Sequence, residues 1–461
     1  MKRFFYIFVA TFALMATLSS CDQQDSRSSI LKVYNWGDYI DEELLDEFEE
    51  WYFEQTGEEV EIIYQTFDIN EVMLAKIENG EADFDVVCPS EYIIERMLHN
   101  ELLLPILTPE FVEEINARDI NYFDCVSPYI KEQFSLLEAP QGIDPNDYSV
   151  GYMWGTTGIL YNKDYVTEEE ALSWSLLFDE RFDDMIFIKD AFRDVYSPIL
   201  IYAKTLEARK NGLLAEDEYL DIETIRELMY DSSDESIALV ESYLKRMKEL
   251  VAGWEADFGK EMMTQEKAWI NLMWSGDAVW AIDEAKSVDV DLGYVVPKEG
   301  SVVWFDGWVI PKYARNTKAA SYFINFMCMP ENALRNMDMT GYVSAVGGEE
   351  VLENMQDEEF PPIDVTYFFG EGADSICVNP VMYPQKSIIE RCGMMHDAGT
   401  EKLLRMWSRV KGDSASAWTY ILICLVFLGL IAAVIVKYTK NYYRRQRYAK
   451  KRKKKNQKKG N

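Results

Sequence analysis

The spacing of apolar and polar residues predicts that the folded part of the chain begins with a strand followed by a helix. Residues 31–35 alternate between apolar and polar types, whereas residues 42–56 repeat apolar positions at helical spacing and are followed by Gly57. The same criteria predict a strand at 60–64, a helix at 70–80 and a short buried strand at 84–88. Strands and helices that alternate in this way predict a parallel α/β sheet, which binds ligands at the carboxyl ends of its strands.

The middle of the chain, from about 150 to 300, repeats this mixture and predicts a second lobe. The elements expected there and beyond are helices at 222–230 and 236–251, an apolar strand at 302–311, and helices at 318–327 and 400–410. The absence of a sequence repeat of about 20 to 50 residues argues against a solenoid. With 461 residues, of which 48% are apolar, the chain is long enough for a two-lobed α/β fold.

The N-terminus has the composition of an export signal. Two basic residues precede an apolar run at 4–18, and two serines and Cys21 follow it. This order resembles a bacterial lipobox, in which the signal is cut before a cysteine that then carries lipid. An ordinary signal followed by a chance cysteine is the alternative. We therefore expect a lipoprotein signal peptide at 1–20, a lipid on Cys21 and a polar tether at 21–30.

A second apolar segment, at 418–436, contains no charged residue and is long enough as a helix to cross about 30 Å of hydrocarbon. A linker at 412–417 precedes it and a basic tail at 437–461 follows it, so the positive-inside rule places that tail in the cytoplasm. Nucleic-acid binding by the lysine-rich tail is the alternative, but contact with anionic lipid suits this composition better. The sequence thus predicts a C-terminal transmembrane helix and an extracytoplasmic protein anchored to the membrane.

The charge of the segment between the predicted signal peptide and the basic C-terminal tail limits which partners that segment can bind. The chain has 46 Lys and Arg against 80 Asp and Glu, a formal net charge of −34, and both predicted ends are basic without a single acid. The part between them is therefore more acidic still, which disfavours nucleic acid and favours small cations. A general requirement for solubility is the alternative explanation.

Cysteine and histidine are too few and too scattered for a metal centre. Besides Cys21 and Cys424 in the apolar C-terminal segment, the chain has an odd number of cysteines without close pairs: Cys88, Cys125, Cys328, Cys377 and Cys392. This is no disulfide framework, although one or two bridges are compatible with it. With two histidines and no metal-ligand spacing, we expect neither a metal nor another cofactor.

Five segments place an aromatic residue beside a carboxylate or hydroxyl group directly after a predicted strand. They are residues 35–39, 89–92, 189–194, 274–277 and 304–308. Tryptophan and tyrosine faces cover methylene groups and attract a cation by roughly 0.5 to 2 kcal/mol each, and carboxylates hold charged ends by charge-assisted hydrogen bonds. Each segment alone also suits a core aromatic or a helix cap. Together they predict a site for a flexible alkyl chain with ammonium groups.

Motifs in a fixed order along residues 31–412 carry a resemblance to a known family. They are Val33-Tyr34-Asn35-Trp36-Gly37-Asp38-Tyr39, Phe67-Asp68-Ile69-Asn70-Glu71, Asp85-Val86-Val87-Cys88-Pro89-Ser90, Tyr152-Met153-Trp154-Gly155-Thr156-Thr157-Gly158, Val296-Pro297-Lys298-Glu299-Gly300, Trp304-Phe305-Asp306 and Gly341-Tyr342. On these motifs the chain resembles the spermidine/putrescine-binding proteins of bacterial ABC importers. The resemblance implies a two-lobed periplasmic-binding-protein fold of type II, whose hinge-linked lobes close over the ligand. Lobe 1 would comprise 31–145 and 306–350, and lobe 2 would comprise 146–305 and 351–411.

The resemblance also implies roles for individual residues. The aromatic box around the polyamine chain corresponds to Trp36, Tyr39, Trp274 and Trp304. The carboxylate that binds an ammonium group corresponds to Asp306, and an acid of the putrescine-type members corresponds to Asp277. Polar contacts correspond to Asp38, Ser90, Tyr92 and Tyr342, and further acids to Asp190 and Asp194. Met395 stands where a spermidine-type member has Gln, so the resemblance leaves the preferred polyamine open.

The sequence therefore predicts the substrate-binding component of an ABC importer, a monomer that captures a polyamine such as putrescine or spermidine and delivers it to the permease. A binding protein for another small cation such as thiamine and a membrane-anchored polyamine sensor are the alternatives. Paired acids flanked by aromatics also occur in glycosidases, but no adjacent acid pair, nucleophile elbow or phosphate loop supports an enzyme.

Overall fold

The computed structural model describes residues 27–412 apart from 81 and 257. The predicted signal peptide at 1–20, the lipidation site Cys21 and the basic tail at 437–461 lie outside the described residues. The chain divides into two compact units, one up to Leu403 and one from Leu404 onward, and the fold below is that of the first unit.

A twelve-stranded mixed sheet organises the described part of this unit, with the main strand order β2-β1-β3-β10-β5-β8-β6-β7. These strands are β1 (Ile30–Trp36), β2 (Glu61–Phe67), β3 (Val86–Val87), β5 (Ser149–Asn162), β6 (Ile186–Lys189), β7 (Val251–Glu255), β8 (Ile270–Trp274) and β10 (Ser301–Pro311). Four more pair beside this path: β4 (Leu103–Leu104), β9 (Leu292–Val295), β11 (Val343–Ser344) and β14 (Cys392–Met394). A separate ribbon pairs β12 (Pro362–Ile363) with β13 (Ile376–Cys377).

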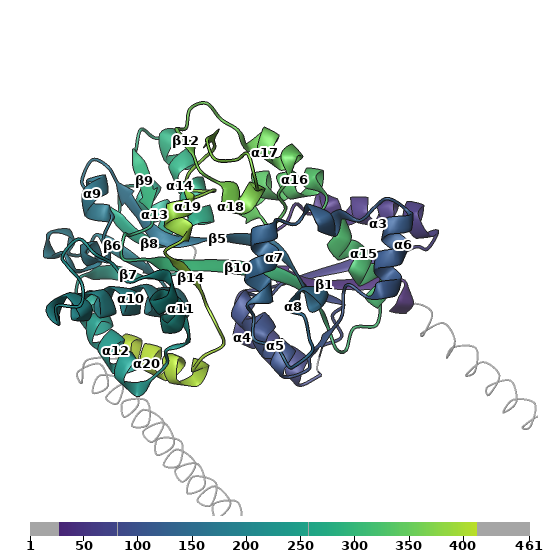
Figure 1. Cartoon of the computed structure of the whole chain (residues 1–461), viewed down its shortest axis with the longest axis horizontal. Coiled ribbons are helices and arrows are strands. Elements are labelled where there is room, and N and C mark those ends of the chain that lie inside the picture. The colour runs from purple at the N-terminus through teal and green to yellow at the C-terminus, as the bar shows by residue number, and fades with distance from the viewer. Residues whose placement is uncertain (1–26, 81, 257, 413–461) are drawn as a thin grey trace, which may run out of the picture. The chain divides into compact units, whose positions relative to one another are not determined.

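Both ends of the sheet are parallel, as the alternation of strands and helices predicts. Strand β1 pairs in parallel with β2 and β3, and β6 pairs in parallel with β7 and β8. The antiparallel strands β5 and β10 connect these two ends, and both are buried along their whole length. Figure 1 shows the two groups of elements at opposite ends of β5 and β10. Two long buried strands thus join two α/β halves.

Helices cover the faces of the sheet at both ends. The first half has α3 (Glu43–Thr56), α4 (Asn70–Glu78), α5 (Glu91–His99), α6 (Pro109–Ala117), α7 (Pro128–Ser135), α8 (Pro145–Tyr148), α15 (Thr317–Met327) and α16 (Pro330–Thr340). The second half has α9 (Glu168–Ala171), α10 (Phe192–Lys210), α11 (Ile222–Tyr230), α12 (Asp234–Lys248), α13 (Gly259–Thr264) and α14 (Ser275–Lys286). Later helices are α17 (Glu349–Met355), α18 (Thr366–Phe369), α19 (Lys386–Ile389) and α20 (Thr400–Gly412). Short 3-10 turns lie at Tyr122–Cys125, Trp174–Phe178 and Glu180–Phe182.

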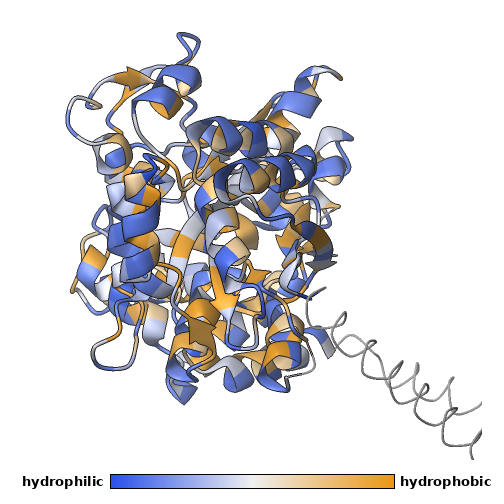
Figure 2. Ribbon diagram, turned by 90° about the vertical axis from the view of Figure 1, so that its right-hand side faces the viewer, coloured by the Kyte–Doolittle hydropathy of each residue, from blue (hydrophilic) through white to orange (hydrophobic). Residues whose placement is uncertain are grey.

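Apolar residues gather on the strands and on the inner faces of the helices, as the colours of Figure 2 show. The larger core joins the β1 half to Trp154 and Phe305 on the two long strands, and a smaller core surrounds Leu160 and Met273 in the second half. Phe368 and Tyr383 belong to the larger core, although the predicted boundaries assign 351–411 to lobe 2. The larger core therefore contains residues of both predicted lobes, and the lobe boundaries stay a prediction.

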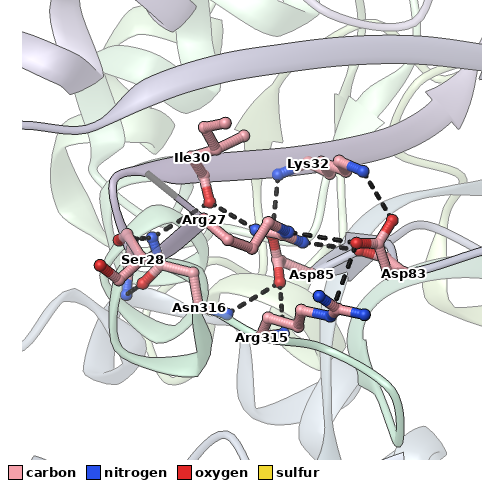
Figure 3. Close-up of polar contacts among 9 residues, drawn as sticks. Arg27, Ser28, Ile30, Lys32, Asp83, Asp85, Arg315 and Asn316 are labelled. Atoms are coloured by element: carbon pink, nitrogen blue, oxygen red, sulfur yellow. Dashed lines mark hydrogen bonds and ion pairs between the residues drawn. The ribbon is translucent and has the colours of Figure 1, made fainter. Parts of the chain in front are cut away.

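An ion-pair network fixes the start of the fold (Figure 3). The fully buried carboxylate of Asp85 accepts hydrogen bonds from the Arg27 side chain and from the backbone amides of Lys32, Arg315 and Asn316. A buried carboxylate that accepts hydrogen bonds from several donors is held in a fixed position. Residues 27–30, assigned to the tether by the sequence, therefore continue directly into β1 and pack on the folded part.

The fold-class prediction requires one correction. It added a C-terminal transmembrane helix to the α/β fold, but within residues 27–412, apart from 81 and 257, no helix is long and apolar enough to cross a bilayer. The segment 418–436, to which that prediction applied, lies outside the described residues. The prediction was based on the local hydropathy of one segment, and the described fold is a two-lobed α/β fold without a membrane helix.

Candidate functional site

Asp306 lies at an irregular point of β10, where the sheet brings three separate segments together. The pairing of β10 with β5 shifts between Asp306 and Gly307. The Asp306 side chain is 7% exposed and accepts two hydrogen bonds, from the Tyr39 hydroxyl at 2.8 Å and the Ser90 hydroxyl at 2.7 Å. Both carboxylate oxygens are thus oriented by neutral donors, which fix an acid without neutralising it.

Tyr39 and Ser90 reach this acid because each directly follows a strand of the first half. The chain leaves β1 through Asp38, whose φ of 52° turns the backbone so that the Tyr39 ring packs on Tyr152 at 5.6 Å between centroids. Ser90 precedes α5 in the N-cap position, yet its side chain makes no cap hydrogen bond. Its hydroxyl bonds to Asp306 instead, so a residue type typical of helix caps serves the site.

Asp277 is a second buried acid, in the first turn of α14. It accepts hydrogen bonds from the Lys189 ammonium group at 2.7 Å and the Tyr342 hydroxyl at 3.0 Å, and Lys260 lies 3.5 Å away. Gly276 allows this arrangement, because a Cβ at that position would lie 2.3 Å from Tyr342 Cδ1. The absence of a side chain at Gly276 therefore permits the tyrosine ring to lie against α14.

Lys189, the last residue of β6, has no exposed surface. Its ammonium group bonds to Asp277, to the Ala256 carbonyl at 2.8 Å and to Glu255 at 3.3 Å. It also lies 4.2 Å from the centroid of the Trp274 ring. The lysine is thus surrounded by two carboxylates, a carbonyl and an aromatic face, which together compensate the charge of a buried ammonium group.

The two acids belong to one series of contacts, which we call the contact ring. From Asp306 the series runs through Tyr39 to Tyr342, whose rings pack at 5.3 Å and 76°, and then to Asp277 and Lys189. It continues through Trp274, whose indole N–H donates to Asp194 at 2.9 Å, and Asp194 acts electrostatically on Asp306. The contact ring consists of Asp306, Tyr39, Tyr342, Asp277, Lys189, Trp274 and Asp194.

Trp304 packs on this ring from β10. Its ring centroid lies 5.5 Å from that of Tyr342 with the planes at 68°. The buried indole nitrogen of Trp304 has no hydrogen-bond partner among the described residues. Buried indole N–H groups usually have one, so an acceptor from a bound molecule would suit this position.

At the Asp306 end of the site, no Lys, Arg or His of the described residues pairs with the aspartate. Burial, with a smaller contribution from the Asp194 carboxylate, raises the pKa of Asp306 to about 6 against the hydrogen bonds from Ser90 and Tyr39. Burial also raises the pKa of Asp194, although the Trp274 indole and the charges of Lys189 and Arg193 oppose the shift. Glu91, fully buried behind Asp306, has its pKa raised well above the usual value by burial. These shifts favour either protons or a bound cation.

At the Asp277 end of the site, lysines of the protein itself balance the charge of the aspartate. Burial would raise the pKa of Asp277, but the charges of Lys189 and Lys260 outweigh it and hold that pKa below its usual value. Burial likewise disfavours the charged form of Lys189, yet Asp277 and Glu255 hold its pKa above the usual value. Asp277 and Lys189 therefore form a buried ion pair in which both groups are charged.

The remaining predicted residues differ in how they are placed relative to the contact ring. Tyr92 is connected through Asn70, whose amide donates to both the Tyr92 and the Ser90 hydroxyl oxygens. Trp36 packs on Phe67 at 4.4 Å between centroids. The other two predicted residues, Asp38 and Asp190, have exposed side chains. The structure thus places most of the predicted site residues together and leaves these two acids at the surface.

Sequence reasoning missed the cation in the ring. Lys189 belongs to one of the segments singled out above, but only the acids of that segment were considered as site residues. A lysine that ends an apolar strand was the available signal, because lysine is almost never fully buried without a partner. Glu91 and Lys260 carried no comparable signal, since glutamate and lysine are common in helices.

No group of three or more His, Cys, Asp or Glu side chains that could hold a metal ion occurs within the described ranges. The five cysteines of those ranges, Cys88, Cys125, Cys328, Cys377 and Cys392, are free. Besides the Lys189 ammonium group, the contact ring consists of carboxylates, two phenols and one indole. Such a set suits an organic cation.

Comparison with known proteins assigns the class. A family model described as a bacterial extracellular solute-binding protein matches residues 43–359, more than half of the chain. The chain therefore belongs to the family of bacterial extracellular solute-binding proteins.

Individual relatives have names that are more specific. The spermidine/putrescine-binding periplasmic protein of Escherichia coli is 26% identical over 347 residues, which cover 74% of this chain and 84% of the relative. The putrescine-binding periplasmic protein SpuD of Pseudomonas aeruginosa is 26% identical over 401 residues, covering 84% and 93%. The spermidine/putrescine ABC transporter substrate-binding protein PotD of Streptococcus pneumoniae has a solved structure that covers 83% of this chain and 98% of its own, at 28% identity and a TM-score of 0.58.

Proposed function

We propose that this chain is the substrate-binding component of an ABC importer and captures a polyamine such as putrescine or spermidine outside the cytoplasm. One observation carries the proposal: Asp306 is buried and held by two neutral donors, and no Lys, Arg or His within the described residues pairs with it. A buried carboxylate of this kind is stabilised by a ligand cation. The acidic chain and the surrounding aromatic rings support an alkylammonium ligand over an anion or a sugar.

The names of the relatives support the same ligand class and the same location. They are described as periplasmic and as binding spermidine or putrescine, or as components of an ABC transporter. The proposal therefore includes an importer permease as the partner that receives the ligand. In this role the protein binds and releases its substrate without converting it.

Export to that location would use the N-terminal segment. We include in the proposal a signal peptide at 1–20 and a lipid on Cys21, on the composition of these residues alone. Cys21→Ser should then prevent lipid attachment and leave the signal uncut, which mass spectrometry of the protein purified from a bacterial host would detect. Processing that is the same in the variant and the wild type would contradict the lipidation site.

Calorimetric titration of the purified full-length chain with putrescine, spermidine and spermine tests the ligand class. We expect one-to-one binding of at least one of them, and a loss of roughly 30-fold or more in affinity in Asp306→Asn, because removing one member of a buried charge pair costs about 2 to 5 kcal/mol. Asp217→Asn, at an exposed aspartate of the second half, is the matched control and should bind as the wild type does. No binding of any of the three amines would overturn the polyamine assignment.

A further inference from the structure

Lys189 occupies the kind of position that a ligand ammonium group would take. Its ammonium group lies 4.2 Å from the Trp274 ring centroid and 2.7 Å from Asp277. An aromatic face combined with a carboxylate is the set of contacts by which proteins bind alkylammonium ligands. Both Trp274 and Asp277 therefore already contact a cation, and this cation belongs to the protein.

A ligand would not readily displace this lysine. Lys189 is fully buried and has two further acceptors, the Ala256 carbonyl at 2.8 Å and Glu255 at 3.3 Å. If a ligand ammonium took its place at Asp277, the Lys189 charge would remain buried with part of its partners lost, which is strongly unfavourable. Asp277 is therefore not available as a ligand acid while Lys189 is present.

The two acids lie at the two ends of a pair of packed tyrosines. The Tyr39 hydroxyl bonds to Asp306, the Tyr342 hydroxyl bonds to Asp277, and the two rings pack at 5.3 Å. An extended amine that begins at Asp306 and follows these rings would bring its far ammonium group toward Asp277. A short diamine would instead place its charges near Asp306, which has no internal cation, and the neighbouring Asp194.

We infer that Lys189 is a specificity-determining residue that supplies an internal ammonium group at Asp277 and so restricts the site to short diamines. This inference rests on the proposed function. In the wild type, the third ammonium group of spermidine has no free acid at that end, and its desolvation is not compensated. Putrescine lacks this third charge and meets only the end where Asp306 has no internal cation. The protein therefore binds spermidine no more tightly than putrescine.

The test compares the affinities for spermidine and putrescine in the full-length protein and in Lys189→Met, which keeps the length of the side chain and removes its charge. We expect the ratio of spermidine to putrescine affinity to rise by roughly tenfold to hundredfold, the range for a hydrogen bond to a charged group. The double variant Lys189→Met/Asp277→Asn should return the ratio to the wild-type value, since the gain requires the freed acid. Lys163→Met, at a surface lysine paired with Asp291, is the matched control.

Three outcomes separate this inference from the proposed function. A wild type that already prefers spermidine tenfold or more, or a folded Lys189→Met whose ratio stays unchanged, would overturn the role of Lys189 alone. A wild type that binds neither amine would overturn the proposed function and this inference with it.

If Lys189→Met does not fold alone, thermal unfolding followed by circular dichroism replaces the titration. Spermidine at millimolar concentration should then restore a cooperative transition, and putrescine should restore it less. Equal effects of the two amines on this variant would overturn the inference.

Discussion

The Asp306 end and the Asp277 end of the site have similar surroundings but opposite electrostatics. Each aspartate is buried and accepts a hydrogen bond from a tyrosine, Tyr39 in one case and Tyr342 in the other. Asp306 has the Ser90 hydroxyl as its other partner, and its pKa is raised to about 6. Asp277 has the Lys189 ammonium group, and its pKa is lowered.

The difference shows that an aspartate beside aromatic rings is not by itself a ligand acid. Burial penalises the charge of both acids, and only the presence or absence of an internal cation decides whether a ligand cation is needed. Asp306 therefore depends on solvent protons or ligand for compensation. Asp277 instead contributes to the stability of the fold.

The largest expected effect concerns the internal pair. Lys189→Ala should lower the free energy of unfolding of the ligand-free protein by about 3 to 5 kcal/mol, because it leaves Asp277 buried without its main cation. Lys163→Ala, which removes a surface pair with Asp291, should cost no more than about 1 kcal/mol. Urea unfolding followed by tryptophan fluorescence measures both. Equal costs would show that Asp277 does not depend on Lys189.

The next effect is the pH dependence of ligand affinity. An acid with a pKa of about 6 is protonated below that pH and cannot balance an ammonium group, so putrescine affinity should fall about tenfold between pH 7 and pH 5. The ion pair of Asp277 and Lys189 does not produce such a loss, because the pKa of the Asp277 carboxyl group is lowered and lies below this pH range. Calorimetry at several pH values tests this, and a flat profile in the wild type would exclude Asp306 as the ligand acid.

In the ligand-free protein, the raised pKa of Asp306 makes the folded state more stable at low pH than at neutral pH. The folded-state pKa of Asp306, about 6, is above the unfolded value of about 3.9, so the folded state holds the proton more tightly. Its stabilising contribution, on the order of 3 kcal/mol, is fully present below about pH 3.9 and is lost as the pH rises through 6. Asp306→Asn should remove this part of the pH dependence of unfolding.

A smaller effect is expected where α14 meets the tyrosine pair. In Gly276→Ala the new Cβ would lie 2.3 Å from Tyr342 Cδ1, so the ring has to move away from Asp277 and Tyr39. We expect a loss of about 1 to 3 kcal/mol in stability, the usual cost of overpacking. Gly37, with open space around its Cβ position and no positive φ, provides the matched control Gly37→Ala.

The smallest effects separate the two tyrosine hydroxyls. Tyr39→Phe and Tyr342→Phe each remove one hydrogen bond to an aspartate, worth about 0.5 to 1.5 kcal/mol. Loss of the Tyr39 hydroxyl should also move the pH midpoint of putrescine binding upward, because this bond lowers the pKa of Asp306. Tyr342→Phe should move that midpoint less. An equal shift in both variants would contradict the assignment of separate roles to the two acids.

Much of the fold could be predicted from the pattern along the chain. The strand at 31–35 and the helix at 42–56 are found as β1 and α3, and Gly57 ends that helix with a φ of 72°. Local patterning suffices there because each element buries one face against its immediate neighbours. The assignment of 351–411 to lobe 2 stays a prediction, and the burial of Phe368 and Tyr383 in the larger core depends on contacts distant in sequence.

The candidate site was predicted to a similar degree. The family resemblance implied the roles of Asp306, Tyr39 and Ser90. Tyr39 and Ser90 follow strands, Asp306 lies within β10, and the sheet brings the three together. The acids Asp38 and Asp190 were named on the same reasoning but are exposed, because the direction of a side chain after a strand depends on the turn. The ligand-binding role of all these residues stays a prediction until binding is measured.

The sequence by itself determined the α/β class, the acidic character and the segments that carry aromatic and acidic residues, since these depend on composition and local periodicity. Only the tertiary structure decided which acid has an internal cation. Lys189 and Asp277 are 88 positions apart in the chain, and their charges meet only because β6 pairs with β8, the strand that leads directly into α14. The charge of a site is a sum over spatial neighbours, so tertiary structure was needed to distinguish the two acids.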